Sequence, residues 1–192
     1  MRVLGIDCGT EYTGYGIVDL VSDRDRSRGA QHCEPRYSIR PENDHLVCVA
    51  CGAIKVSPRD PMPTRLAGIA RGLEELIALH QPNRVAIEDV FYAVNVKSAL
   101  KLGQVRGVAM LTAASAGLDV AEYSPLSIKS AVVGYGKAEK QQVQQMVARL
   151  LRLDEVPEPA DAADALAIAI CHLHTAATLE SQSGGFERRP TR

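Results

Sequence analysis

Hydrophobic and polar positions alternate along the first third of the chain, a pattern typical of strands. Residues 2–7 form a short apolar run that ends in an acid, and residues 14–20 and 46–56 continue the alternation. The charged, unpatterned residues 21–45 between them are expected to form an extended surface loop. The chain therefore begins with three predicted strands.

Helical spacing replaces the alternation further along, where Leu66, Ile69, Leu73 and Leu76 lie on one face of a predicted helix over residues 63–80. The pattern then predicts a strand at 84–88, a helix at 95–116, a strand at 118–122, a helical turn ending near 133, and helices at 138–153 and 161–177. This order predicts an α/β fold, with a mixed five-stranded sheet covered by helices on both faces. We expect one domain over residues 1–178, followed by a flexible tail over residues 179–192.

Composition narrows the class of protein. The 192 residues are 46% hydrophobic, which is typical of a globular chain. No apolar run reaches the roughly 18 residues of a membrane span, and the first residues do not resemble a signal peptide. Five unevenly spaced cysteines do not indicate a secreted disulfide framework. We expect a cytosolic protein whose net charge of −1 neither favours nor excludes nucleic acid, because phosphate binding needs local clusters of Lys and Arg.

Four acids from distant segments are candidates for one site. Asp7 and Glu88 each end an apolar strand, where α/β sheets place ligands. Asp161 and Asp164 are three residues apart and share a face of the last predicted helix. Singly, each has a structural explanation, since strand ends are solvated and the helix dipole favours acids in a first turn.

Together the four carboxylates would repel one another unless a cation compensates them. Mg²⁺ and Mn²⁺ prefer oxygen ligands and suit this role. Two such ions about 3.5–4 Å apart would polarise a phosphate, generate hydroxide and stabilise the leaving oxygen. The acids thus indicate phosphodiester chemistry without identifying the family.

Five segments resemble the successive motifs of the RuvC family of Holliday junction resolvases. They are GIDCGTEYTGYGIVD, AIEDVFYAVN, SALKLGQVRGVA, VVGYGKAEKQQVQQMV and DAADALAIAICHLH. They come in family order at near-family spacing and cover nearly the whole chain outside residues 21–45 and the tail. Two departures are Cys8, where the family often has Pro, and a longer loop between the second and third strands.

The resemblance implies a ribonuclease H-like fold, a homodimer, Mg²⁺ dependence and paired symmetric nicks across a four-way DNA junction. It also implies cooperation with the RuvAB branch-migration motor. Residue by residue, it assigns the metal-binding and catalytic roles to Asp7, Glu88, Asp161 and Asp164.

Several residues are candidates for contacts with DNA. Phe91, three positions after Glu88, is expected to stack on a base at the junction centre, which is worth about 1–3 kcal/mol per base; loop packing is the alternative. Lys129 and Lys140 match family positions and are expected to contact phosphates. Their alternative is a solvated face. The same two interpretations apply to Lys97, Lys101, Arg106 and Lys137.

Gly103 and Gly107 lie inside the predicted helix 95–116, at a cost of about 1 kcal/mol each relative to Ala. Such a cost favours close approach by another element. The resemblance places this helix at the dimer interface. We therefore expect the two glycines, with Leu100 and Leu111, to pack against a twin helix or against the chain's own sheet.

A short stretch of the chain holds five possible zinc ligands, His32, Cys33, His45, Cys48 and Cys51. Zinc needs four nitrogen or sulfur ligands at one point. Cys48 and Cys51 are an odd number of positions apart in a predicted strand, which places them on opposite faces. The spacing therefore favours buried, apolar cysteines, with a zinc site as the alternative.

Other functions are compatible with parts of the sequence. The segment GIDCGT also resembles the first phosphate loop of actin-like ATPases and sugar kinases, but those proteins need two such domains, and no second Gly-rich phosphate loop follows. A catalytically inactive junction-binding protein would not need the complete acidic set. A related ribonuclease H-like nuclease acting on RNA or on other branched DNA is a further alternative.

Overall fold

The computed structural model describes residues 1–21, 44–89 and 96–183. Its five strands are β1 (Arg2–Asp7), β2 (Tyr12–Val21), β3 (His45–Lys55), β4 (Arg84–Glu88) and β5 (Val120–Tyr123). They form one sheet in the order β3-β2-β1-β4-β5. Strands β1, β2 and β3 are antiparallel neighbours, whereas β4 and β5 run parallel to β1. The predicted mixed five-stranded sheet is confirmed.

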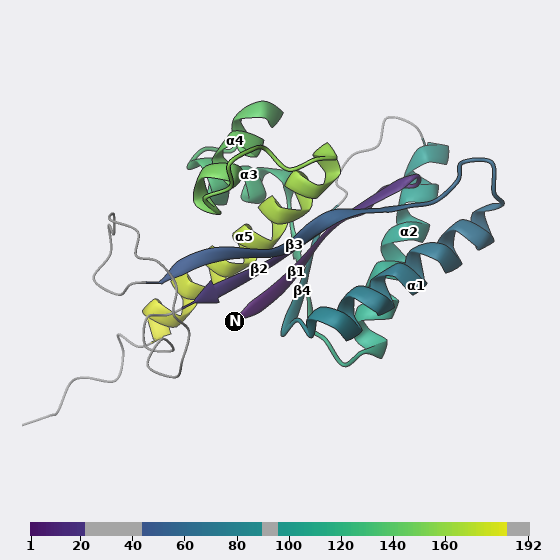
Figure 1. Ribbon diagram of the computed structural model, residues 1–192, viewed down its shortest axis with the longest axis horizontal. Helices are drawn as coiled ribbons and strands as arrows, with labels where there is room; N and C mark the ends of the chain where they lie inside the picture. The colour runs from purple at the N-terminus through teal and green to yellow at the C-terminus, as the bar shows by residue number, and fades with distance from the viewer. Residues whose placement is uncertain (22–43, 90–95, 184–192) are drawn as a thin grey trace, which may run out of the picture.

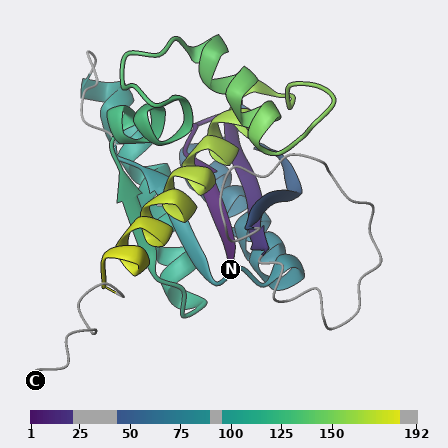
Figure 2. The ribbon, with the colours of Figure 1, turned by 90° about the vertical axis from the view of Figure 1, so that its left-hand side faces the viewer.

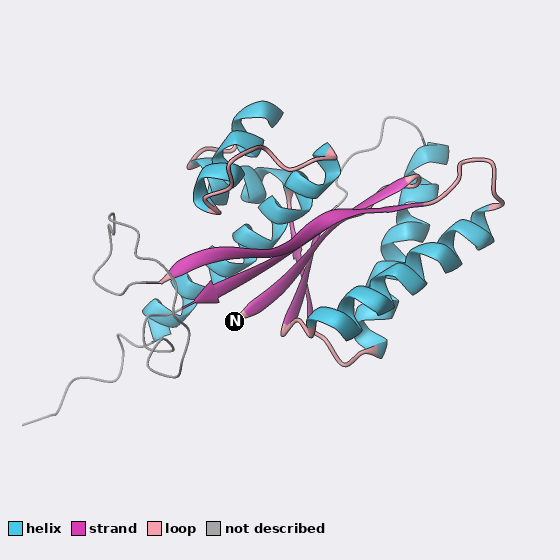
Figure 3. Ribbon diagram, viewed as in Figure 1, coloured by secondary structure: helices cyan, strands magenta, loops and turns pink. Residues whose placement is uncertain are grey.

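Helices cover both faces of this sheet (Figures 1 and 3). Helices α1 (Met62–His80) and α2 (Val96–Ser115) lie on one face, and α3 (Pro125–Val133), α4 (Lys140–Leu150) and α5 (Ala160–Ser183) on the other. Figure 2 shows α5 running across the strands. Among the helices of the described ranges, none has both the length and the hydropathy needed to cross a bilayer.

The alternation of side chains in the central strands explains the two helical layers. In β1, Val3 packs into the cluster formed with α3, α4 and α5, whereas Leu4 and Ile6 pack against α1 and α2. All three side chains are fully buried, and each such burial contributes about 1.5–3 kcal/mol. Strand β4 alternates in the same way, so the middle of the sheet is apolar on both faces.

Three glycines let α5 lie directly on the β1–β2 hairpin. A Cβ atom added at Gly14 would collide with the carbonyl oxygen of Asp161, and one at Gly16 would lie 2.6 Å from the backbone nitrogen of Leu166. Gly5 makes the same kind of approach to the helix backbone. Since no side chain separates the layers here, the first turns of α5 are held against the ends of β1 and β2.

The structure shifts several predicted boundaries. Helix α5 continues to Ser183, so residues 179–183, expected as tail, are helical. Thr178, near the expected boundary, is exposed. Strands β2 and β3 extend to Val21 and His45, which pair with each other. The remainder of the predicted loop 21–45 lies outside the described residues.

Candidate metal centre and active site

Strand register brings Asp7 and Glu88 side by side. Ile6 of β1 pairs with Ile87 of the parallel strand β4, so the acids that follow them end neighbouring strands at the same edge. Both isoleucines point toward α1 and α2. The two acids therefore point to the opposite face, on which α5 lies. This placement is the one predicted from the apolar runs.

The other two acids come from the first turns of α5. Asp161 lies over Gly14, which is the partner of Asp7 in the β1–β2 ladder. Asp164 stands one turn further on and lines a cavity together with Asp7 and Glu88. Asp161 is outside the cavity lining, but its charge still acts on Asp7. The four predicted acids are thus brought to one end of the sheet.

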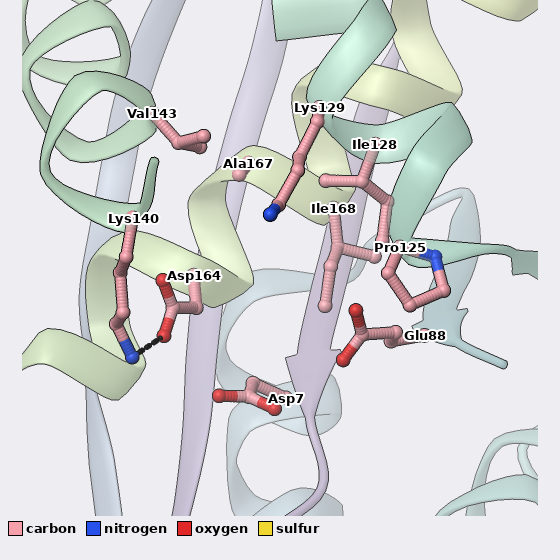
Figure 4. Close-up of a pocket in the computed structure, with 10 residues that line it drawn as sticks. All are labelled: Asp7, Glu88, Pro125, Ile128, Lys129, Lys140, Val143, Asp164, Ala167 and Ile168. Carbon is pink, nitrogen blue, oxygen red and sulfur yellow. Dashed lines mark ion pairs between the residues drawn. The ribbon is translucent and has the colours of Figure 1, made fainter. Parts of the chain in front are cut away.

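The cavity has a volume of about 310 Å³ and an acidic floor beneath two lysines (Figure 4). Lys129 of α3 and Lys140 of α4 reach into it from above. Apolar residues form the rest of its wall, namely Pro125, Ile128, Val143, Ala167 and Ile168.

Burial and mutual repulsion make the acids poor anions in the absence of a cation. Burial, followed by the charges of Asp164, Glu88 and Asp161, raises the pKa of Asp7 to about 7, although Lys140 opposes the shift. The pKa of Glu88 is raised by burial and by Asp164, against the two lysines. A cation placed among these carboxylates would remove this penalty.

Lys140 already compensates one of the acids. Its Nζ atom lies 2.6 Å from Oδ2 of Asp164, and this hydrogen bond is the main cause of the raised pKa of Lys140 (Figure 4). Tyr135 Oη and the backbone N–H of Glu139 both donate to Gln142 Oε1, each at 2.9 Å. These bonds fix the start of α4, where Lys140 is the first residue.

The donor set fits a hard divalent cation, because it consists of carboxylate oxygens facing one cavity. Within the described ranges, no three His, Cys, Asp or Glu side chains stand close enough together to hold an ion as they are placed. Asp164 is turned to Lys140 instead. A cation that took Oδ2 of Asp164 as a ligand would compete with the Lys140 ammonium group for that oxygen.

The sequence did not predict the contacts of two arginines near the site. Arg106, a candidate for DNA contact or a solvated face, pairs with Asp89 and Glu122 and is only 17% exposed, so the solvated face was wrong, whereas the DNA contact stays untested. Arg65 was not singled out. It is buried and donates to the carbonyl oxygen of Thr10 in the turn after β1. Its place on the apolar face of α1 was the available signal.

The remaining candidates for DNA contact are three lysines and one phenylalanine. Lys97, Lys101 and Lys137 are exposed. Phe91 lies outside the described residues, so its stacking role stays a prediction.

The glycines of α2 do not approach the chain's own sheet. Among the described residues, nothing lies within 4 Å of a Cβ atom added at Gly103 or at Gly107. Leu100 and Leu111, on the same face, are 66% and 67% exposed. Packing against the chain's own sheet was therefore wrong, and no described segment covers this face of α2.

The argument that Cys48 and Cys51 point to opposite faces was also wrong. The β2–β3 register shifts between Ile17 and Val18, which makes Val49 the extra residue of a β-bulge. The bulge changes the parity of β3, so both thiols pack on the α5 side. Burial and the neighbouring Cys51 raise the pKa of Cys48 to about 12.

These two cysteines do not form part of a larger metal-binding group within the described ranges. His45 is an odd number of positions from its neighbour Leu46, which packs on the α5 side, so it points to the other face. His32 and Cys33 lie outside the described residues, and a zinc site that includes them stays an untested alternative.

Comparisons with known proteins agree with this geometry. The family model described as crossover junction endodeoxyribonuclease RuvC matches residues 29–172. A crossover junction endodeoxyribonuclease RuvC from Koribacter versatilis is 63% identical over 179 residues, covering 93% of this chain and 96% of that protein.

Solved structures are similar as well. The structure of Thermus thermophilus RuvC matches with a TM-score of 0.76 at 31% identity, and covers 93% of this chain and 96% of that one. The same protein in complex with a Holliday junction substrate matches with a TM-score of 0.75 at 28% identity over the same shares. The ribonuclease H-like fold predicted from the sequence is therefore confirmed.

Proposed function

Because this chain belongs to the RuvC family of crossover junction endodeoxyribonucleases, we propose that it resolves four-way DNA junctions by paired, symmetric, metal-dependent nicks. The observation that supports this proposal most is the cavity in which Asp7, Glu88 and Asp164 face Lys129 and Lys140. Metal-dependent hydrolysis of a phosphodiester uses acids that bind the cations and positive groups, such as lysines, that neutralise the phosphate. DNA as substrate makes the cytoplasm the expected compartment.

The proposed cofactor is Mg²⁺, with Mn²⁺ able to substitute and two ions in each site. Asp7, Glu88, Asp161 and Asp164 are the proposed ligands and catalytic acids. Bound there, the ions would activate the attacking water and neutralise charge on the leaving oxygen. The raised pKa values of Asp7 and Glu88 support this assignment, since carboxylates that repel one another gain most from a shared cation.

The lysines have separate proposed tasks. Lys129 extends from α3 into the cavity and would contact a phosphate of the cleaved strand. Lys140 is held by Asp164 in the absence of an ion. If Asp164 held the ion instead, the Lys140 ammonium group would be free to neutralise the phosphate as negative charge develops.

Two symmetric nicks need two active sites. Because each chain carries one candidate site, we propose that the protein acts as a homodimer. We place the interface on the exposed face of α2 formed by Val96, Leu100, Gly103, Gly107 and Leu111. Its three large apolar side chains are 66–75% exposed. An apolar stripe of this kind marks an interaction surface, and the two glycines would let a second helix approach closely.

Two further proposals rest on the family resemblance. Phe91 would stack on a base unpaired at the junction centre. The RuvAB branch-migration motor is the proposed partner that delivers junctions.

The direct test compares cleavage of a synthetic four-way junction, a linear duplex and an RNA–DNA hybrid by the wild-type protein with Mg²⁺. We expect paired nicks in the junction and little cleavage of the other substrates. Preferred cleavage of the hybrid would instead favour a ribonuclease H-like nuclease acting on RNA, and absence of cleavage of any substrate would contradict an enzymatic function.

A further inference from the structure

Arg106 connects helix α2 to the ends of two strands beside the candidate metal centre. Its Nε atom donates to the backbone carbonyl oxygen of Glu88 at 3.2 Å. Its Nη2 atom pairs with Glu122 of β5 and lies 3.5 Å from Oδ1 of Asp89. The Arg106 side chain is only 17% exposed, whereas the Asp89 and Glu122 carboxylates lie at the surface, 36% and 44% exposed.

The backbone of Glu88 needs such support. The register of β4 with β1 ends at Ile87, so Glu88 keeps a ladder partner only in β5, where it pairs with Tyr123. Asp89, the next residue, donates its N–H to the carbonyl oxygen of Tyr123 at 2.8 Å. Arg106 binds the Glu88 carbonyl and thereby holds the strand end between α2 and β5.

The fork of the guanidinium group suits this task. Arginine presents several donors in one rigid plane, whereas a lysine at the same position would offer one compact ammonium group. Here the fork serves one carbonyl and two carboxylates from two strands. These acceptors take up the Nε and Nη2 atoms of the group.

We infer that Arg106 is a positioning residue for Glu88: it fixes the end of β4 so that the Glu88 carboxylate faces the cavity shared with Asp7 and Asp164. This inference rests on the proposed function, in which Glu88 is a metal ligand. Arg106 itself touches neither substrate nor metal. Its effect on metal binding is therefore indirect, through the backbone of its neighbour.

The experiment compares Arg106→Ala and Arg106→Lys with Arg84→Ala. Arg84 is a matched control because it stands at the other end of β4 and pairs with Asp119 at 3.2 Å on the surface. Three quantities are measured below the melting temperature: Mn²⁺ affinity of the DNA-free protein by electron paramagnetic resonance, junction Kd, and the single-turnover cleavage rate.

We expect Arg106→Ala to lower Mn²⁺ affinity and cleavage rate by about 10–100-fold, the usual loss when a residue that orients a metal ligand is removed. Junction Kd should change little. Arg106→Lys should recover part of the loss, and Arg84→Ala should match the wild type. If Arg106→Ala does not fold, the intermediate Mn²⁺ affinity expected of Arg106→Lys still tests the inference.

Unchanged Mn²⁺ affinity and rate in the folded variants, with only a lower melting temperature, would overturn the positioning role. A weaker junction Kd with normal Mn²⁺ affinity would overturn it in favour of a phosphate contact. Mn²⁺ binding is measured without DNA. Failure of the wild type to cleave junctions would therefore contradict the proposed function while leaving the role of Arg106 to be decided separately.

Discussion

Asp7 gives the metal-free protein a pH-dependent stability. Its carboxyl has an ordinary pKa of 3.8, and burial with the charges of three acids raises the pKa to about 7 in the folded chain. Below about pH 4 the group is protonated in both the folded and unfolded states and has no effect. Between about pH 4 and 7 the folded state binds the extra proton, so its stability falls as pH rises, and above 7 the full penalty is present.

Asp7→Asn should therefore stabilise the metal-free protein at about pH 8 and have little effect near pH 4. In a chain of this length, each 1 kcal/mol gained raises Tm by about 2–4 °C. Thermal unfolding in a chelator, measured across this range for the wild type and the variant, checks the prediction. A difference in Tm that does not depend on pH would contradict it.

The positions of the acids were easier to predict than the long-range hydrogen bonds around them. Asp7 and Glu88 follow apolar runs in the sequence, so their positions at strand ends could be read directly. The bond from Arg65 to Thr10 and the bond from Arg106 to Glu88 join residues far apart in the chain. Periodicity places Arg65 on the buried face of α1, but it identifies the acceptor of neither bond, because each depends on how α1 and α2 dock on the sheet.

At the scale of elements, the packing of α5 on β1 and β2 determines the positions of Asp161 and Asp164. Gly5→Ala places a Cβ atom against the backbone of α5 and should destabilise the fold by at least about 1–3 kcal/mol, as overpacking does. Gly68→Ala in α1 is the control, because its added methyl would meet only a Val56 methyl at 3.2 Å. Denaturant unfolding measures both.

If Gly5→Ala unfolded at the same denaturant concentration as the wild type, α5 would not lie directly on β1. Near-neutral behaviour is expected of Gly68→Ala, because the gain in helix propensity of about 1 kcal/mol is offset by the tight contact of the new methyl with Val56.

Strand and helix order could be predicted from periodicity, but face assignments failed where a strand is irregular. In β1 the regular alternation gives the correct face for every residue from Val3 to Asp7. In β3 the bulge at Val49 reverses the parity and brings Cys48 and Cys51 to one face. A bulge has no signature in the alternation itself, so alternation alone assigns the residues beyond it to the wrong face.

At the scale of the whole molecule, the exposed face of α2 predicts a dimer. Leu111→Glu places a charge on this face and should convert the dimer to a folded monomer. Leu79→Glu is the matched control, because Leu79 is 75% exposed on α1, outside the proposed interface. Light scattering gives the mass, and circular dichroism shows whether the fold is kept.

A wild-type protein that is monomeric under cleaving conditions would contradict this arrangement. So would equal loss of the dimer in Leu79→Glu, since the interface would then not be specific to α2.

The central claim is that the four acids hold the metal that cleaves a four-way junction. Single-turnover cleavage of one junction in Mg²⁺ tests it with four variants, each assayed for junction binding in the same preparation: Asp7→Asn, Glu88→Gln, Asp161→Asn and Asp164→Asn. We expect each to slow cleavage by about 10²-fold or more, while junction affinity stays close to that of the wild type because lysines, and not these acids, make the proposed phosphate contacts. Cleavage at the wild-type rate by any variant would show that its acid is not a ligand, and wild-type rates in all four would contradict the proposed active site.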